Sequence, residues 1–309
     1  MGVRTRRPAD EGALLQLVYY GFVIGSAIAR WLPERFVYGV AHALGSVAAR
    51  VSKRRRTVER NLARITGRPR DSREVQDLVV ASFRSYARYW LETFRLVREG
   101  KDFFLERALS TGGELIDESV ERHGGAIVVV GHLGNWDAGG AWASARGNHL
   151  VSVAEVLRPR RVFDFFVAHR AKLGMTIVPA QPGATQQLAD WVEKGAVVAI
   201  LGDRDLKGRG PRVTFFGEEV PFPAGPASVA FRTKCPILVA GVFGIRFDDG
   251  RFGWRIEIEG PIEIPEERTE EAVARVTQEI ATRLEGFVAR RPEEWHVMQP
   301  FWPSDRAGS

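Results

Sequence analysis

The sequence predicts an α/β fold with a largely parallel central sheet flanked by helices, preceded by an apolar helical segment at the N-terminal end. Three observations predict this fold. Short β-branched runs alternate with helical stretches from residue 126 onward, residues 71–97 carry apolar residues at helical spacing, and residues 13–51 are mostly apolar. The length of 309 residues and the hydrophobic content of 45% fit one large domain of this class.

The first apolar stretch, residues 13–32, is interrupted by Gln16, Ser26 and Arg30. A helix that crosses a bilayer needs about 20 consecutive apolar residues, so we expect this helix not to span the membrane. A second apolar helix is expected over residues 36–51, after Pro33.

Four consecutive cations, Lys53, Arg54, Arg55 and Arg56, follow the second apolar helix. Two apolar helices bordered by cations are typical of an interfacial anchor on anionic lipid, which is our interpretation. The alternative is that both helices belong to the core and that the basic run is a solvated corner.

Charge is distributed unevenly along the chain. Residues 1–110 contain 21 Lys and Arg against 11 Asp and Glu, whereas the rest contains 23 against 27. A basic segment favours an anionic partner, and because these cations border apolar helices we expect a lipid surface and no nucleic acid. The single cysteine, Cys235, excludes an internal disulfide, and the histidines show no metal-ligand spacing, so no metal site is expected.

The helix expected over residues 71–97 has the amphipathic pattern of an element packed on the core. Beyond it, six short β-branched runs predict strands, at residues 126–132, 150–156, 176–179, 197–203, 237–243 and 254–260. Helical stretches separate several of these runs, which favours parallel strands joined by crossover helices. After Pro292 we expect an irregular cap rich in Trp and Pro.

Ligands of open α/β sheets collect at the carboxyl ends of strands, and the first polar cluster there is Gly131-His132-Leu133-Gly134-Asn135-Trp136-Asp137. We expect the carboxylate of Asp137 to return to the His132 imidazole from the first turn of a helix. A carboxylate on one ring nitrogen fixes the tautomer, while the other nitrogen takes a proton from a hydroxyl. The alternative is a buried histidine that only satisfies a nearby carboxylate.

A second polar cluster, Gly202-Asp203-Arg204-Asp205, ends another apolar run. We expect Asp203 to support His132 across the site, the alternative being a plain ion-pair cluster. Farther on, a turn that includes Gly225 leads to a helix near Pro226, whose free N–H groups are suited to an anion. Turn scaffolding is the other interpretation of that segment.

These motifs carry a family resemblance. The segments GHLGNWDAGGAW, AEVLRP, HRAKLGM, GDRDL, FFGEEVPFPAGPA and CPILVAGVF, in that order, resemble the lysophospholipid acyltransferase superfamily. Within it they are most similar to the branch of lipid A late acyltransferases and phosphatidylinositol mannoside acyltransferases, with Asp137 in GHLGNWD favouring the mannoside enzymes. The resemblance covers most of the chain. It implies transfer of a fatty acyl group from a thioester to a lipid hydroxyl by an H-x4-D dyad.

The resemblance also implies residue roles. His132 is similar to the family's base, Asp137 to its partner, and Asp203 to a carboxylate that relays charge to the histidine. The remaining residues expected to bind substrate are Glu155, Arg170, Asn135, Trp136, Arg204 and Gly225. Glycerol-phosphate acyltransferases carry an acidic residue and a Thr-Arg pair where this chain has Ala224 and Pro226, so that phosphate-binding motif is absent here.

From the resemblance we expect residues 1–60 to associate with the membrane and residues 61–309 to form the catalytic domain. The expected donor is acyl-CoA, with no resident cofactor, and the expected acceptor is a phosphatidylinositol mannoside at the cytoplasmic face of the inner membrane. A lipid A precursor is the alternative acceptor, and a non-catalytic lipid-binding scaffold is the alternative class. No G-x-S-x-G, P-loop or dinucleotide motif occurs in the chain, which argues against those enzyme classes.

Overall fold

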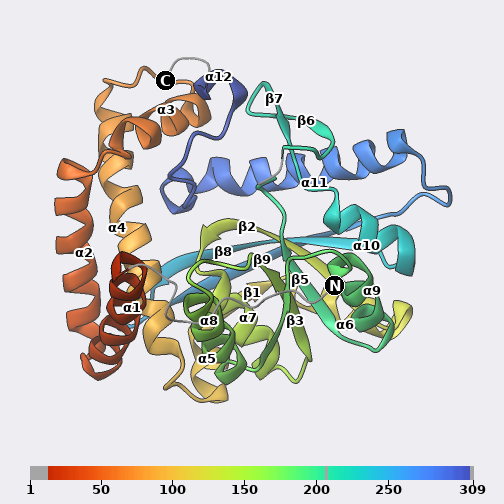
Figure 1. Cartoon of the computed structure of the whole chain (residues 1–309), viewed down its shortest axis with the longest axis horizontal. Coiled ribbons are helices and arrows are strands. Elements are labelled where there is room, and N and C mark those ends of the chain that lie inside the picture. The colour runs from red at the N-terminus through yellow and green to blue at the C-terminus, as the bar shows by residue number, and fades with distance from the viewer. Residues whose placement is uncertain (1–12, 206–207, 307–309) are drawn as a thin grey trace.

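A seven-stranded sheet in the order β1-β9-β8-β2-β5-β3-β4 forms the centre of the fold (Figure 1). The computed structural model describes residues 13–205 and 208–306. The strands of this sheet are β1 (Ala108–Thr111), β2 (Ala126–Gly134), β3 (Leu150–Ala154), β4 (Met175–Pro179), β5 (Val197–Leu201), β8 (Ile237–Arg246) and β9 (Phe252–Ile262). Five adjacent strands, from β8 to β4, are parallel, whereas β9 and β1 run the opposite way. The predicted α/β class, its mostly parallel sheet and all six predicted strands are confirmed.

Three short strands were not predicted. One is β1 at the sheet edge, and the other two, β6 (Arg212–Phe215) and β7 (Glu218–Pro221), form a separate antiparallel hairpin. Phe216 and Gly217 connect the hairpin, with φ of 49° and 77°. Two left-handed residues in succession match the right-handed twist of the flanking strands, so the segment expected to be a plain turn is a tight hairpin.

Helices cover both faces of the sheet (Figure 1). One face carries α5 (Lys101–Arg107), α6 (Glu114–His123) and α7 (Trp136–Ala145), and the other carries α9 (Ala184–Glu193), α10 (Gly225–Thr233) and α11 (Glu270–Arg290). Alternate residues of β2 serve the two faces: Ile127 and Val129 pack in the core beside α11, and Ala126 and Val128 pack in the core beside α7. This alternation follows from the two-residue repeat of a strand.

The four N-terminal helices form one side of the molecule (Figure 1). They are α1 (Ala13–Trp31), α2 (Glu34–Val51), α3 (Arg55–Thr66) and α4 (Arg73–Leu96). The helix predicted over 71–97 is α4, which begins where the Ser72 hydroxyl accepts a hydrogen bond from the Val75 N–H. Both α1 and α2 pack against α4. Across the described residues, no helix has both the length and the apolar character that crossing a bilayer requires.

Two further helices and the last segment complete the description. Helix α8 (Arg160–Lys172) links β3 to β4 and contacts α1. After α11 the chain forms a short 3-10 turn, η2 (Pro292–Glu294), and a final helical turn, α12 (Pro303–Arg306). The expected Trp-rich cap lies here, with Trp295 and Trp302 both buried. The part of the predicted N-terminal segment before Ala13 lies outside the described residues.

Candidate active site

His132 lies near the end of β2, on the same face of the sheet as Val128 and Val130. The chain then turns towards α7 at Gly134, where φ is +59° and a Cβ atom would stand 1.6 Å from the carbonyl oxygen of Val242. Glycine is therefore required at this position. At Gly131, a Cβ would meet its nearest neighbour, Leu284 Cδ2, at 3.5 Å, an ordinary contact. Only the second of the two predicted glycines is needed for the turn.

The imidazole of His132 is paired with Asp203, at the end of β5. Nδ1 of His132 lies 2.6 Å from Asp203 Oδ1, and the main-chain N–H of His132 donates to Asp203 Oδ2 at 2.9 Å. Burial by itself would raise the pKa of Asp203, but the charge of His132 and hydrogen bonds from His132 and Trp295 lower that pKa below its usual value. An ionised carboxylate can only accept hydrogen bonds, so Nδ1 is the donor in this contact, and in the neutral form of such a ring the lone pair lies on Nε2.

Asp137 does not contact the imidazole, and the expectation that it would is wrong. Its carboxylate is buried and accepts hydrogen bonds from Arg170 Nε at 2.7 Å, from Arg170 Nη2 at 3.4 Å and from the Tyr89 hydroxyl at 3.1 Å. Burial disfavours the charged form of Arg170 and by itself would lower its pKa. The charge of Asp137 and its hydrogen bond outweigh this effect and raise the pKa of the guanidinium above its usual value. Burial and Asp137 likewise raise the pKa of the Tyr89 hydroxyl. The first turn of α7 thus directs Asp137 towards α8 and α4.

Asn135 holds the turn between β2 and α7. Its side-chain oxygen accepts the Ala138 N–H at 3.0 Å, which caps α7, and its amide donates to Glu92 Oε2 at 2.8 Å. The same Glu92 oxygen accepts the indole N–H of Trp254 at 3.2 Å. Asn135 is therefore buried in the framework of the site and does not line the cavity where we expected it to bind substrate.

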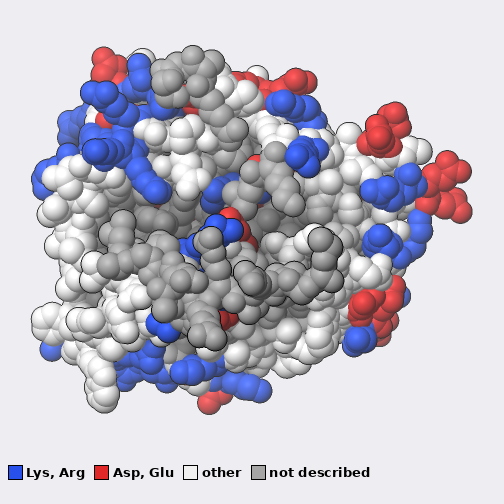
Figure 2. Space-filling view, in the orientation of Figure 1, with Lys and Arg blue, Asp and Glu red and all other residues white. Residues whose placement is uncertain are grey.

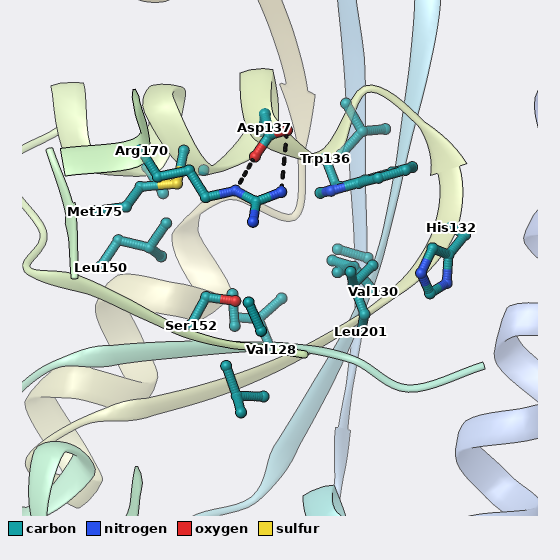
Figure 3. A pocket seen from close by; sticks show the side chains of 18 of the residues that line it. Val128, Val130, His132, Trp136, Asp137, Leu150, Ser152, Arg170, Met175 and Leu201 are labelled. Carbon is teal, nitrogen blue, oxygen red and sulfur yellow. Dashed lines mark hydrogen bonds and ion pairs between the residues drawn. The ribbon is translucent and has the colours of Figure 1, made fainter. Parts of the chain in front are cut away.

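A cavity of about 360 Å³ opens beside His132 and runs across the sheet beneath α7 (Figure 3). Small side chains of the strands, including Ser152, Ala199 and Ala240, leave the space that it fills. Its apolar lining comes from four helices and six strands, and includes Ile116, Val128, Trp142, Leu150, Phe163, Phe166, Met175, Val197, Ile256 and Ile258. A cavity with this lining suits an apolar ligand.

Polar groups of the cavity lining include four residues predicted from the sequence: Trp136, Glu155, Arg170 and Arg204. Figure 3 shows the Trp136 indole lying between His132 and the Arg170–Asp137 pair. The indole N–H of Trp136 is buried and has no hydrogen-bond partner among the described residues. Arg204 donates to Gln299 Oε1 at 2.6 Å.

Gly225 lies outside the cavity lining, at the first residue of α10. The next residue, Pro226, approaches the end of β5, with its Cγ 3.7 Å from where a Cβ on Gly202 would stand. Gly225 therefore belongs to the framework behind Asp203 and not to the substrate surface that we predicted.

Two residues of the site were missed by the sequence analysis. Tyr89, on α4, contacts Asp137, and the Trp295 indole N–H donates to Asp203 Oδ2 at 2.9 Å. Both lie far along the chain from the residues they contact, and neither stands in a local motif. Within residues 13–205 and 208–306, no group of three or more His, Cys, Asp and Glu side chains is placed to hold a metal ion.

An imidazole paired with a buried carboxylate at the wall of a largely apolar cavity is typical of an enzyme site that takes an apolar substrate. Residues 10–304 match the family model described as bacterial lipid A biosynthesis acyltransferase. The chain belongs to this family and is an acyltransferase.

Similar curated proteins show which members of the family the chain resembles. The chain is 32% identical over 294 residues to a phosphatidylinositol mannoside acyltransferase of Mycolicibacterium smegmatis, covering 94% of this chain and 93% of the relative. It is 32% identical over 258 residues to proteins of the same name from two strains of Mycobacterium tuberculosis, covering 82% of this chain and 78% of each relative. The predicted resemblance to the lipid A and mannoside acyltransferase branch is confirmed.

Proposed function

We propose that this acyltransferase moves a long fatty acyl chain from acyl-CoA to a hydroxyl of a phosphatidylinositol mannoside, with His132 as the general base. The observation that carries the proposal is the His132–Asp203 pair, with Nε2 free of protein partners among the described residues, beside a long apolar cavity. The names of the curated relatives support the acceptor.

The proposed reaction proceeds in two steps. Nε2 of His132 takes the proton of the acceptor hydroxyl as its oxygen attacks the thioester carbonyl carbon, giving a tetrahedral oxyanion. The carbon–sulfur bond then breaks, the new ester forms, and the imidazolium returns the proton to the leaving thiolate. Asp203 stabilises the imidazolium between the steps. The unpartnered Trp136 N–H is available to a substrate oxygen.

Substrate groups divide between the two parts of the cavity. The acyl chain is assigned to the apolar lining beneath α7, because burial of each methylene from water contributes about 0.8 kcal/mol. The polar acceptor headgroup is assigned to the polar side chains of the lining, Glu155, Arg170 and Arg204. Arg170 is held in place by Asp137.

We further propose that α1 and α2 bind the cytoplasmic face of the inner membrane. Each helix exposes large apolar side chains at spacings of three or four residues: Leu17, Tyr20, Ile24, Ile28 and Trp31 on α1, and Phe36, Val40, Leu44, Val47 and Val51 on α2. We call these residues the apolar stripe. An exposed apolar surface of this extent is typical of an interaction site. Figure 2 shows cations gathered over α3, next to the uncharged face of α1 and α2, which suits anionic lipid.

The acceptor is tested by incubating the purified protein with radiolabelled palmitoyl-CoA and a panel of mannosylated phosphoinositides and lipid A precursors. We expect label on a phosphatidylinositol mannoside. Label on a lipid A precursor would show that the proposed acceptor is wrong. Activity only with acyl carrier protein thioesters would show that the proposed donor is wrong.

The base is tested in the same assay with His132→Ala. A positioned base supplies about 10²–10⁴-fold in rate, so transfer should fall by at least that range while the melting temperature stays near that of the wild type. Wild-type transfer by a folded His132→Ala protein would reject His132 as the base. If the wild-type protein labels no lipid at all but binds acyl-CoA, the lipid-binding scaffold becomes the better account.

A further inference from the structure

The segment from Arg291 to His296, which we call the strap, crosses the end of β2 beside His132. The main-chain N–H of His296 donates to the His132 carbonyl oxygen at 2.7 Å, and Leu133 forms an antiparallel bridge with Trp295. Glu294 anchors the strap by accepting the Gly244 N–H at 2.9 Å. The main chain around His132 is therefore held on one side by Asp203 and on the other by the strap.

The strap also reaches the carboxylate that pairs with His132. Asp203 Oδ1 faces the imidazole, and Oδ2 accepts two hydrogen bonds at 2.9 Å, one from the His132 main chain and one from the Trp295 indole. Asp203 and Trp295 are buried, with 1% and 3% of their surfaces exposed. Trp295 is the one group from outside the His132 segment that the described residues bring into hydrogen-bond contact with this carboxylate.

We propose that Trp295 is a positioning residue for acyl transfer, whose indole N–H fixes the plane of the Asp203 carboxylate and thereby aims His132 Nε2 at the acceptor hydroxyl. This inference rests on the proposed role of His132 as the base. Without the indole N–H, both remaining partners of the carboxylate, the imidazole on Oδ1 and the main-chain N–H on Oδ2, belong to His132 itself. No group outside His132 then fixes the plane of the carboxylate, and the ring bonded to it can shift with it. Loss of an angstrom of alignment between reacting groups can cost about a hundredfold in rate.

Trp302 supplies a matched comparison within the same aromatic cluster. Its ring centroid lies 5.9 Å from that of Trp295, and its surface is 0% exposed. Its indole N–H donates at 3.0 Å to a main-chain carbonyl, that of Phe215. Replacing either tryptophan by Phe removes one buried N–H donor and a similar ring volume, but only the change at Trp295 takes a donor from Asp203.

The two roles of Trp295, packing and positioning, differ in their effect on pH dependence. The indole N–H presents the positive end of its dipole to Asp203, so its removal leaves a more negative potential around the adjacent imidazolium. The acidic limb of the pH profile of kcat/KM should therefore move to higher pH. The other charged or titratable groups near the pair are His296 on the strap and, along the cavity, Arg204, Glu155 and the Arg170–Asp137 pair. All of them are unchanged in both Trp→Phe variants.

The experiment compares the full-length wild type, Trp295→Phe, Trp302→Phe and His132→Ala in the palmitoyl-CoA assay between pH 5 and 9. We expect kcat/KM of Trp295→Phe to fall by about tenfold or more, mainly through kcat, because a hydrogen bond to a charged group is lost. The acidic limb should shift upward for Trp295→Phe and stay unchanged for Trp302→Phe. If Trp295→Phe fails to fold, benzothienylalanine at this position keeps the ring shape and removes only the N–H.

The outcomes separate the two proposals. A folded Trp295→Phe protein with the rate and pH profile of Trp302→Phe would overturn the positioning role while leaving His132 as the base. Equal rate losses in both variants, with no change of pH profile, would also overturn it, because packing alone would then explain them. Wild-type transfer by His132→Ala would instead remove the proposed mechanism itself.

Discussion

Asp203 and Asp137 are both buried carboxylates, and each faces a different basic side chain. The partner of Asp203 is an imidazole, a group that can lose its charge by releasing a proton. The partner of Asp137 is a guanidinium that stays charged at every pH of interest. We therefore expect Asp203 to serve catalysis and Asp137 to serve stability, although both belong to the predicted site.

Asp203→Asn should lower the rate of acyl transfer by about 10²–10⁴-fold, since the imidazolium loses its charge partner and Nδ1 loses its acceptor. Asp137→Asn should instead reduce the free energy of unfolding by about 3–5 kcal/mol, because it leaves the largely buried Arg170 uncompensated. Urea unfolding and the labelled-lipid assay on both variants check this division. A stable Asp137→Asn protein with an Asp203-like loss of rate would reverse the assignment.

At the residue scale, strand-end reasoning found both His132 and Asp203 from the sequence, because polar residues that follow buried strands must face the sheet's carboxyl edge. The H-x4-D spacing led us to expect contact between Asp137 and the His132 imidazole. The spacing places Asp137 in the first turn of a helix but does not determine which neighbour the side chain faces. Tyr89 and Trp295 could not be found, because their contacts depend on how distant elements pack.

At the level of elements, the proposed place of the acyl chain on the sheet face beneath α7 can be tested by changing the size of a side chain there. Ala240→Leu adds three carbons to the cavity wall on β8, so long chains should lose more than short ones. We expect the ratio of kcat/KM for palmitoyl-CoA over octanoyl-CoA to fall by about tenfold, as crowding by one or a few methylenes typically costs about 1–3 kcal/mol.

The control for the cavity is Val239→Leu, the preceding residue on the same strand, which packs in the core on the opposite face. This variant should leave the ratio of kcat/KM for palmitoyl-CoA over octanoyl-CoA unchanged, whatever its effect on stability. An equal loss with both donors in Ala240→Leu would mean that the acyl chain lies elsewhere.

The basic run between α2 and α3 contains one cation that is already engaged. Arg55 donates to the Ala49 carbonyl oxygen at 2.7 Å and pairs with Glu59 at 2.9 Å, whereas Lys53, Arg54 and Arg56 are exposed. Changing these three exposed cations to Glu should weaken binding to anionic vesicles by about a hundredfold or more, at about 1 kcal/mol per cation. Vesicle sedimentation at moderate ionic strength measures the change.

A triple control reverses exposed cations far from α3, in Arg255→Glu, Arg268→Glu and Arg275→Glu. It alters the net charge of the protein by the same amount and should leave vesicle binding near that of the wild type. Equal loss in both triple variants would make binding a matter of net charge and not of the surface next to the apolar stripe.

Elements with a long, clear pattern were predictable, and short ones were not. The six predicted strands are 5 to 11 residues long, and α4 has 24 residues. The missed strands β1, β6 and β7 have four residues each, and β1 is largely exposed, so they present too few apolar positions to show a repeat of two. Their pairing partners stabilise them.

Two buried histidines link the stability of the whole molecule to pH. Burial lowers the pKa of His296 and of His169 below the ordinary value of 6.5. The folded state therefore stays neutral at both sites while the unfolded chain takes up protons, so their stabilisation is full above pH 6.5 and is lost as pH falls towards the lowered values. In that window each histidine should contribute a slope of about 1.4 kcal/mol per pH unit.

Urea unfolding between pH 7.5 and 5 measures this slope. His296→Gln keeps a group that can hydrogen-bond Ser85, and His169→Gln keeps a donor for the Thr93 carbonyl oxygen. In each variant, the free energy of unfolding should fall less steeply than in the wild type as the pH decreases. A slope identical to that of the wild type in both variants would show that neither histidine is buried neutral.

The order of the strands could not be predicted from the sequence. Runs of β-branched residues indicate that a strand exists, but the sheet places β2, early in the chain, between β8 and β5. The reversal at β9 depends on a direct turn after β8 where a helix would have kept the strand parallel. Such choices are made by the packing of the whole chain, and no local pattern records them.

The position of the strap has a consequence for how the enzyme is made. A ribosome synthesises His132 and Asp203 well before Trp295, so a growing chain can assemble β2, β5 and the apolar cavity while the carboxylate still lacks its indole donor. The site is completed only when the strap emerges and docks across β2. If Trp295 has the proposed positioning role, a chain that ended after α11 would contain every strand of the sheet and still lack the donor that orients Asp203.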